Sequence, residues 1–138
     1  EANKKNPDLI ISIATLTGAA RIALGAELPA VFSNNKDLIN DLKIISDQQE
    51  DHFWQLPLWK DYEKHIDSNV AELNNSGNTS FAGAITAALF LLKFVKNKKN
   101  FIHIDAYSWN DRPQAGRPIG GEASLLRGLF SFLYKRYN

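Results

Sequence analysis

The apolar run Leu9–Ala14 near the start of the chain is the feature that most constrains its fold. The run holds three isoleucines and no charged residue, and its apolar side chains do not alternate with polar ones. A strand with one solvated face shows such alternation, so this run is typical of a strand covered on both faces, as in a parallel sheet. Thr15–Gly18 then interrupts the run, and a short helix is predicted over Ala19–Leu24.

Strands and helices alternate along the rest of the chain. Further strands are predicted at Pro29–Ser33, Val70–Leu73 and Phe101–Asp105, an aromatic loop at Phe53–Trp59, and helices at Asn35–Asp51, Thr79–Lys96 and Glu122–Arg136. Asn35 is expected to cap its helix, in which apolar residues recur on one face. The helix over 79–96 mixes small with large apolar residues, which predicts a core helix packed close against its neighbours. The alternation indicates the α/β class.

The composition is that of an ordinary folded domain. Of the 138 residues, 44% are hydrophobic and 22% charged, which excludes a disordered or low-complexity chain. Sixteen Lys and Arg against fifteen Asp and Glu give a net charge of +1, too balanced for a protein that binds nucleic acid or a membrane surface. The absence of Cys excludes disulfides and thiolate metal ligands. We therefore expect neither nucleic acid nor a membrane as a partner.

The segment Thr15–Gly18 is the first candidate site, because it lies where a buried strand leads into a helix. Ligands of open α/β sheets bind at this carboxyl edge. Gly18 would let a ligand approach the backbone closely, and free N–H groups there could bind a carboxylate, a phosphate or an oxyanion. The segment matches no dinucleotide or P-loop fingerprint, and no Lys follows the glycine. A plain strand-to-helix turn and an anion-binding loop both fit these residues.

Two polar pairs later in the chain are further candidates. His103 and Asp105 share one face of a predicted strand, so they could hold a metal, form a general-base couple or make a structural hydrogen bond. Arg112 and Arg117 could clamp an anion, or lie on a surface loop. No convergent set of metal ligands is visible, and neither a G-x-S-x-G elbow nor a Cys nucleophile is present. Aromatic residues that could line a pocket or an interface are Trp54, Trp59, Tyr107 and Trp109.

Several blocks of the sequence together resemble one known family. The blocks are Pro7–Ala20, Ala23–Gly25, Leu56–Trp59 with Tyr62, Ala71–Asn75, Ala82–Leu91 and His103–Asp105. In residues, order and spacing they resemble the leucyl (cytosol) aminopeptidases, which are two-metal peptidases with a C-terminal catalytic domain. The Ala-Thr-Leu-Thr-Gly-Ala block is the most specific of them.

The resemblance implies that residues 1–138 are the C-terminal portion of a zinc-peptidase-like catalytic domain. It implies a mixed, mostly parallel sheet flanked by helices, in which Leu9–Ala14 is a central strand with a partner on each side. In the family, the metal ligands and the catalytic Lys and Arg precede this region, the last of them in an Asn-Thr-Asp-Ala-Glu-Gly-Arg motif. No such motif occurs here, and the chain begins at Glu1. We therefore expect two divalent ions, Mn or Zn, bound outside this chain, and no catalytic residue within it.

The substrate-binding residues are expected at Thr15, Leu16, Thr17 and Gly18. By the family pattern, the backbone of Leu16 and Gly18 hydrogen-bonds the peptide and Thr15 lines the pocket for its first side chain. The resemblance also gives the Leu16 N–H to a bicarbonate general base. Typical members carry an Ile-Ala-Gly-like run after the His-x-Asp strand. A bulkier pocket wall, which puts a leucine preference in doubt, is expected here from Ala106, Tyr107 and Trp109.

The activity implied by the resemblance is hydrolysis of the N-terminal peptide bond by a two-metal mechanism. The family is cytoplasmic and hexameric, so the same location and a homohexamer are expected. Two other hypotheses stay open. The chain could be a non-catalytic truncated remnant or folding unit of such an enzyme, or a phosphate-binding α/β domain.

Overall fold

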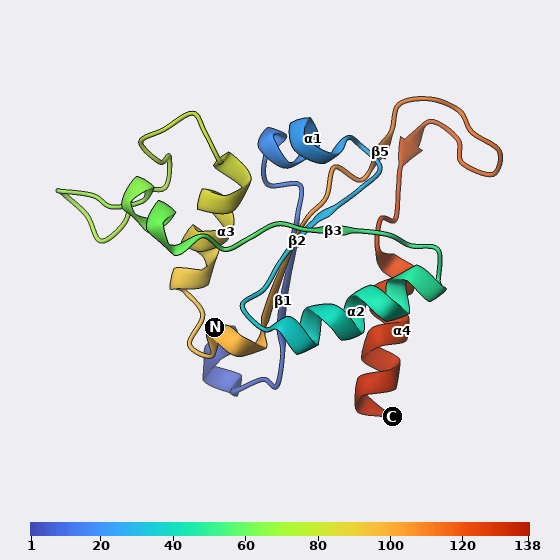
Figure 1. Cartoon of the computed structure of the whole chain (residues 1–138), viewed down its shortest axis with the longest axis horizontal. Coiled ribbons are helices and arrows are strands. Elements are labelled where there is room, and N and C mark those ends of the chain that lie inside the picture. The colour runs from blue at the N-terminus through green and yellow to red at the C-terminus, as the bar shows by residue number, and fades with distance from the viewer.

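The structure is a computed structural model that describes residues 1–138. It is built around a four-stranded sheet, with helices on both faces and a small two-stranded ribbon beside it (Figure 1). The sheet strands are β1 (Ile10–Ala14), β2 (Ala30–Phe32), β3 (Trp54–Gln55) and β4 (Phe101–Asp105), and the ribbon is β5 (Trp109–Asn110) with β6 (Gly120–Gly121). The α-helices are α1 (Gly18–Leu24), α2 (Lys36–Gln48), α3 (Gly83–Lys93) and α4 (Leu126–Tyr137). Short 3₁₀ helices cover Ala2–Lys5, Lys60–His65 and Lys98–Asn100.

The sheet is mixed and mostly parallel, which confirms the predicted class. Its strand order is β1-β4-β2-β3. β1 is parallel to β4 and β2 is parallel to β3, whereas β2 and β4 are antiparallel. β1 lies at the edge with β4 as its single partner, so the expected second partner is not among these residues. On this edge strand, Ile13 is 59% exposed.

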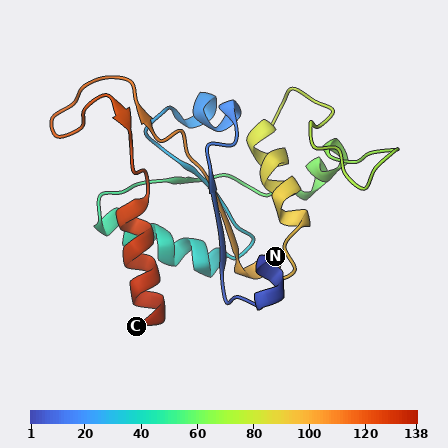
Figure 2. The same ribbon diagram turned by 180° about the vertical axis from the view of Figure 1, so that it is seen from behind.

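Helices cover the two faces of the sheet in pairs (Figures 1 and 2). α2 and α4 lie on one face, and their apolar residues pack with Val31, Ile102 and Ile104 of the strands. α1 and α3 lie on the other face, where small residues predominate. A Cβ built on Gly83 would lie only 3.2 Å from the Ala19 Cβ, so these two helices meet closely. The close packing predicted for the apolar helix is therefore confirmed.

Two helices begin later than predicted. The helix expected from Thr79 begins at Gly83, and the one expected from Glu122 begins at Leu126. In each case the preceding residue has a positive φ, 55° at Ala82 and 64° at Leu125. A left-handed residue cannot continue a right-handed helix, so the chain turns sharply before each one.

The predicted strand Val70–Leu73 is wrong, since this stretch forms bends. The Ser68 hydroxyl accepts hydrogen bonds from the N–H groups of Val70 and Ala71, at 3.2 and 3.1 Å. A side chain that satisfies these donors locally competes with strand pairing. The opposite error occurs in the predicted aromatic loop, where Trp54 and Gln55 pair with β2. No helix has the length and hydropathy required to span a bilayer.

Candidate functional site

Thr15–Gly18, which we name the shelf segment, joins β1 to α1 at the carboxyl edge of the sheet. Because β1 and β4 are parallel, with Ala14 opposite Asp105, the ends of both strands meet beside this segment. Leu16 is 42% exposed, and Thr15 and Gly18 are exposed as well. The segment therefore lies where the sequence placed it, and it faces solvent.

A buried carboxylate holds the shelf segment from below. Asp105, at the end of β4, is 3% exposed. Its Oδ1 accepts hydrogen bonds from the N–H groups of Leu16 and Thr17, at 2.9 and 3.2 Å. Its Oδ2 accepts a third hydrogen bond, of 2.6 Å, from the Thr17 hydroxyl. Three donors of two adjacent residues thus converge on one side chain.

The Thr17 hydroxyl also begins α1. Its oxygen accepts a hydrogen bond of 3.1 Å from the Ala20 N–H, which is the usual contact of an N-cap residue. Since the hydroxyl hydrogen goes to Asp105, the oxygen lone pairs remain for Ala20. The strand end, the shelf segment and the first turn of α1 are therefore joined in one chain of hydrogen bonds.

These contacts change what the shelf segment can bind. The Leu16 N–H, which the resemblance gave to bicarbonate, donates its hydrogen to Asp105. The Thr17 N–H is engaged in the same way. Because both donors already face a carboxylate, a phosphate would lose two amides and meet a negative charge. The phosphate-binding hypothesis therefore loses its structural basis.

Gly18 lies at the first position of α1, where the N–H has no partner within the helix. A Cβ built on this residue would meet no atom of the chain within 4 Å. Neither the packing nor a positive φ requires glycine here. The space beside its Cα is instead open for a ligand to approach the backbone.

The three expected pocket-wall residues have different surroundings. Ala106 is 2% exposed and packs in the core with α2 and α4. Tyr107 lies under the guanidinium of Arg21, whose Cζ is 4.5 Å from the ring centroid. Trp109 is 46% exposed and lines a separate cavity. Tyr107 thus lies against α1, the helix that follows the shelf segment.

His103 and Asp105 share a face of β4 but are not hydrogen-bonded to each other. His103 is fully buried; its Nδ1 lies 3.3 Å from the Ser12 carbonyl oxygen, and its ring stacks on Phe32. Its Nε2 has no partner in the chain. Burial lowers the pKa of His103, although the charge of Asp105 acts in the opposite direction. This histidine is therefore a neutral core residue at neutral pH, and the base-couple and metal interpretations of the pair find no support.

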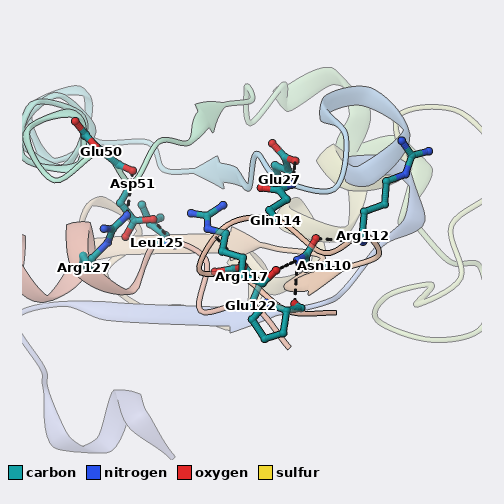
Figure 3. Close-up of polar contacts among 11 residues, drawn as sticks. Glu27, Glu50, Asp51, Asn110, Arg112, Gln114, Arg117, Glu122, Leu125 and Arg127 are labelled. Carbon is teal, nitrogen blue, oxygen red and sulfur yellow. Dashed lines mark hydrogen bonds and ion pairs between the residues drawn. The ribbon is translucent and has the colours of Figure 1, made fainter. Parts of the chain in front are cut away.

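Arg112 and Arg117 line a cavity of about 740 Å³ between the β5–β6 loop and the start of α4. Figure 3 shows the two side chains extending in different directions from their loop. The Arg117 Nε is 3.8 Å from a carboxylate oxygen of Glu122. Gln114 of the same loop donates a hydrogen bond of 3.1 Å to Glu27. The two arginines thus form no clamp, and the cavity walls carry charges of both signs.

Two long-range carboxylate contacts were missed by reasoning from the sequence. Asp105 was weighed only as a partner of His103, although an acidic residue at a strand end is a usable signal for a loop anchor. Asp51 was placed within a helix, but it accepts hydrogen bonds of 2.9 Å from the N–H groups of Leu125 and Gly128 at the start of α4. In both cases the carboxylate is far in the sequence from the N–H groups that it binds, 89 residues for Leu16 and 74 for Leu125.

Comparison with known proteins gives a consistent result. A family model described as the cytosol aminopeptidase family, catalytic domain, matches residues 1–129. The chain is 43% identical over 134 residues to a probable cytosol aminopeptidase of Prochlorococcus marinus (strain AS9601), covering 96% of this chain and 27% of that protein. The chain thus spans about a quarter of the length of this curated relative.

Solved structures agree with this match. The crystal structure of the cytosol aminopeptidase from Coxiella burnetii is similar with a TM-score of 0.93 and 49% identity, over 99% of this chain and 30% of that one. The bottromycin maturation enzyme BotP in complex with Mn is similar with a TM-score of 0.88 and 33% identity, over 95% of this chain and 29% of that one. Both similarities extend over nearly all of the fold described above.

Proposed function

Since the chain belongs to the cytosol aminopeptidase family, we propose that it is part of an enzyme that hydrolyses the N-terminal peptide bond of peptides. Residues 1–138 are, in this proposal, the C-terminal portion of the catalytic domain. That the chain is only a portion of such a domain is supported by its length, since it matches 27% of the Prochlorococcus marinus protein. The chain supplies the substrate-positioning half of the site.

The exposed shelf segment in a chain of this family is the observation that carries the proposal. Its inward N–H groups are fixed by Asp105, and the space beside Gly18 is open. A peptide can therefore be held by the carbonyl of Leu16 and the N–H of Gly18, with the Thr15 side chain near its first residue. Backbone groups bind the peptide backbone irrespective of its sequence, which suits an exopeptidase.

Metal binding belongs elsewhere in this proposal. A divalent ion needs several convergent ligands, and no three His, Asp or Glu side chains of this chain come together. The residues present therefore do not fit a metal centre. We propose that two divalent ions, Mn or Zn, and the catalytic side chains are provided outside residues 1–138; a similar structure is that of BotP in complex with Mn. Any bicarbonate has to be held by groups other than the Leu16 N–H, which donates to Asp105.

A homohexamer in the cytoplasm completes the proposal. The relatives bear the name cytosol aminopeptidase, which supports the location. Large apolar side chains of α4 are exposed, among them Leu126 at 60% and Phe130 at 67%, so a face of this helix is available for contact with further protein. Sedimentation of the active enzyme would test the assembly.

The activity can be tested in a chimeric enzyme. Residues 1–138 would replace the matching segment of the Coxiella burnetii enzyme, to which the chain is 49% identical. With Mn²⁺ or Zn²⁺, we expect the chimera to hydrolyse an aminoacyl anilide and the 138-residue chain alone to be inactive. Activity of the chain alone would contradict the placement of the metal ligands. A folded but inactive chimera would favour the hypothesis of a non-catalytic remnant.

A further inference from the structure

We propose that Asp105 is the positioning residue of the shelf segment, holding the Leu16–Gly18 backbone in the orientation that binds the peptide. This inference rests on the proposed function, since the substrate is the one named there. Asp105 itself does not touch the substrate. It acts from the core side of the segment, through the two amides and one hydroxyl that it binds.

The residue type fits this task. An ionised carboxylate has only acceptor sites, and here both oxygens are used, Oδ1 by two N–H groups and Oδ2 by the Thr17 hydroxyl. Hydrogen bonds to a charged acceptor are stronger than neutral ones. An asparagine at this position would turn an NH₂ group towards donors on one side. The arrangement therefore favours Asp, because only the charged carboxylate accepts from all three donors, whereas Asn would offer the two N–H groups a neutral oxygen and would face the Thr17 hydroxyl with a donor.

Asp105 binds some polar backbone groups of the shelf segment and leaves others free. The N–H groups of Leu16 and Thr17 point inward and are consumed. A peptide group whose N–H points inward has its carbonyl on the opposite side, because the peptide bond is planar and trans. The carbonyls of Thr15 and Leu16 are thereby turned away from Asp105, where a substrate amide can reach them.

The rigidity of the anchor comes from the sheet. Asp105 ends a strand whose five residues are all buried, and its Cα is in register with Ala14 of β1. The position of the exposed shelf segment is therefore fixed by its hydrogen bonds to a residue of the core, and not by packing of the segment itself. Prepositioned contacts cost less ordering entropy when a ligand binds.

Asp51 offers a matched control within the same chain. Its carboxylate also accepts two backbone N–H groups, from Leu125 and Gly128, both at 2.9 Å. These donors belong to the start of α4, and none is in the shelf segment. Asp105→Asn and Asp51→Asn thus each take the charged acceptor from two backbone N–H groups, and Asp105→Asn also affects the Thr17 hydroxyl. Only the first acts on the proposed substrate-binding groups.

The test measures kcat and KM for a dipeptide in the metal-loaded chimera. We expect Asp105→Asn to raise KM at least about tenfold with kcat within about threefold, because the shelf contacts bind ground state and transition state alike. Asp51→Asn should leave KM within about twofold at a similar loss of melting temperature. Thr17→Val should also raise KM. Thr17→Ser, which keeps the hydroxyl, should have the KM of the unmutated chimera.

Hydrogen exchange of the Leu16 and Thr17 amides in the same proteins provides a second readout that does not depend on activity. Asp105→Asn should speed this exchange about tenfold relative to Asp51→Asn, because both amides lose their charged acceptor. Equal KM changes in the two Asp variants, or unchanged exchange and KM in Asp105→Asn, would overturn the inference. If Asp105→Asn fails to fold, the Thr17 pair decides it. If the unmutated chimera is inactive, the proposed function fails and the exchange rates alone decide the role of Asp105.

Discussion

Asp105 and Asp51 make the same kind of contact in two regions of the molecule that have opposite surroundings. Each carboxylate accepts two backbone N–H groups where a helix begins, α1 in one case and α4 in the other. At the shelf segment, the residues held in this way face solvent, with Leu16 42% exposed. At α4, the helix is pressed against α2. The hydrogen-bond pattern alone therefore does not separate a binding site from a structural cap. What differs is the exposure of the residues that donate, since Leu125 is 1% exposed and Gly128 is buried as well.

Among the glycines of the chain, Gly128, at the contact between α2 and α4, has the least space for a side chain. A Cβ built on Gly128 would lie 2.9 Å from the Ser46 Cβ and 3.1 Å from its Cα. The Ser46 hydroxyl is fully buried and has no hydrogen-bond partner. Gly18, at the shelf segment, meets nothing within 4 Å. One glycine allows two helices to meet, and the other leaves room for a ligand.

Gly128→Ala should have the largest effect on stability. The added methyl group would clash with the Ser46 side chain, including its Cβ, which no change of rotamer can move away. The helices must therefore separate, at a cost of about 2 kcal/mol in the free energy of unfolding. Urea unfolding of the chain followed by circular dichroism measures this value. An unchanged unfolding midpoint would show that α2 and α4 can part freely, and the contrast with Gly18 would then be lost.

Asp51→Ala should come next, with a loss of about 1.5 kcal/mol, because two N–H groups at the start of α4 lose their acceptor. The effect is expected in the free energy of unfolding and not in KM of the chimera. Lys43→Ala is a suitable control, since its ion pair with Asp47 is exposed and contributes little. A rise in KM would mean that the cap of α4 also shapes the site, and the two regions would no longer be independent.

Gly18→Ala should separate binding from stability. Alanine is tolerated at the start of a helix and meets no atom here, so the free energy of unfolding should change by less than about 0.5 kcal/mol. The methyl group would occupy the open space, and KM for a dipeptide should rise about fivefold, equal to about 1 kcal/mol. Gly121→Ala, at a site that is also free of neighbours, is the matched control. Equal KM values in both variants would argue against a ligand beside Gly18.

His103 should produce the smallest effect, a dependence of stability on pH. Burial lowers its pKa in the folded chain from the usual 6.5, so the unfolded chain binds a proton more readily. The contribution of neutral His103 to the free energy of unfolding is fully present above pH 6.5, the usual pKa. This contribution is lost as the pH falls towards the lowered pKa of the folded chain. His103→Asn should therefore lose less stability than the unmutated chain between about pH 7.5 and 5. The exposed His52, replaced by Asn, serves as the control; identical pH profiles for both variants would exclude His103 as the source.

Local sequence determined several elements of this protein. The predicted strand Phe101–Asp105 has the same bounds as β4, and Leu9–Ala14 contains β1. Asn35 caps α2 as expected, accepting hydrogen bonds from the N–H groups of Asp37 and Leu38. The signals for these elements lie within a few residues of each other, so apolar runs and capping residues can be interpreted without the rest of the chain. The same holds for the position of the shelf segment, which is the break after the first apolar run.

Only the tertiary structure decided how these pieces are used. Asp105 is 89 residues from Leu16, and Asp51 is 74 residues from Leu125. The start of α4 and the set of amides left free at the shelf segment depend on those distant acceptors. The parallel pairing that brings the ends of β1 and β4 together arises when the sheet forms. Short stretches of sequence specify which groups need partners, whereas the packing of distant segments determines which partners they find.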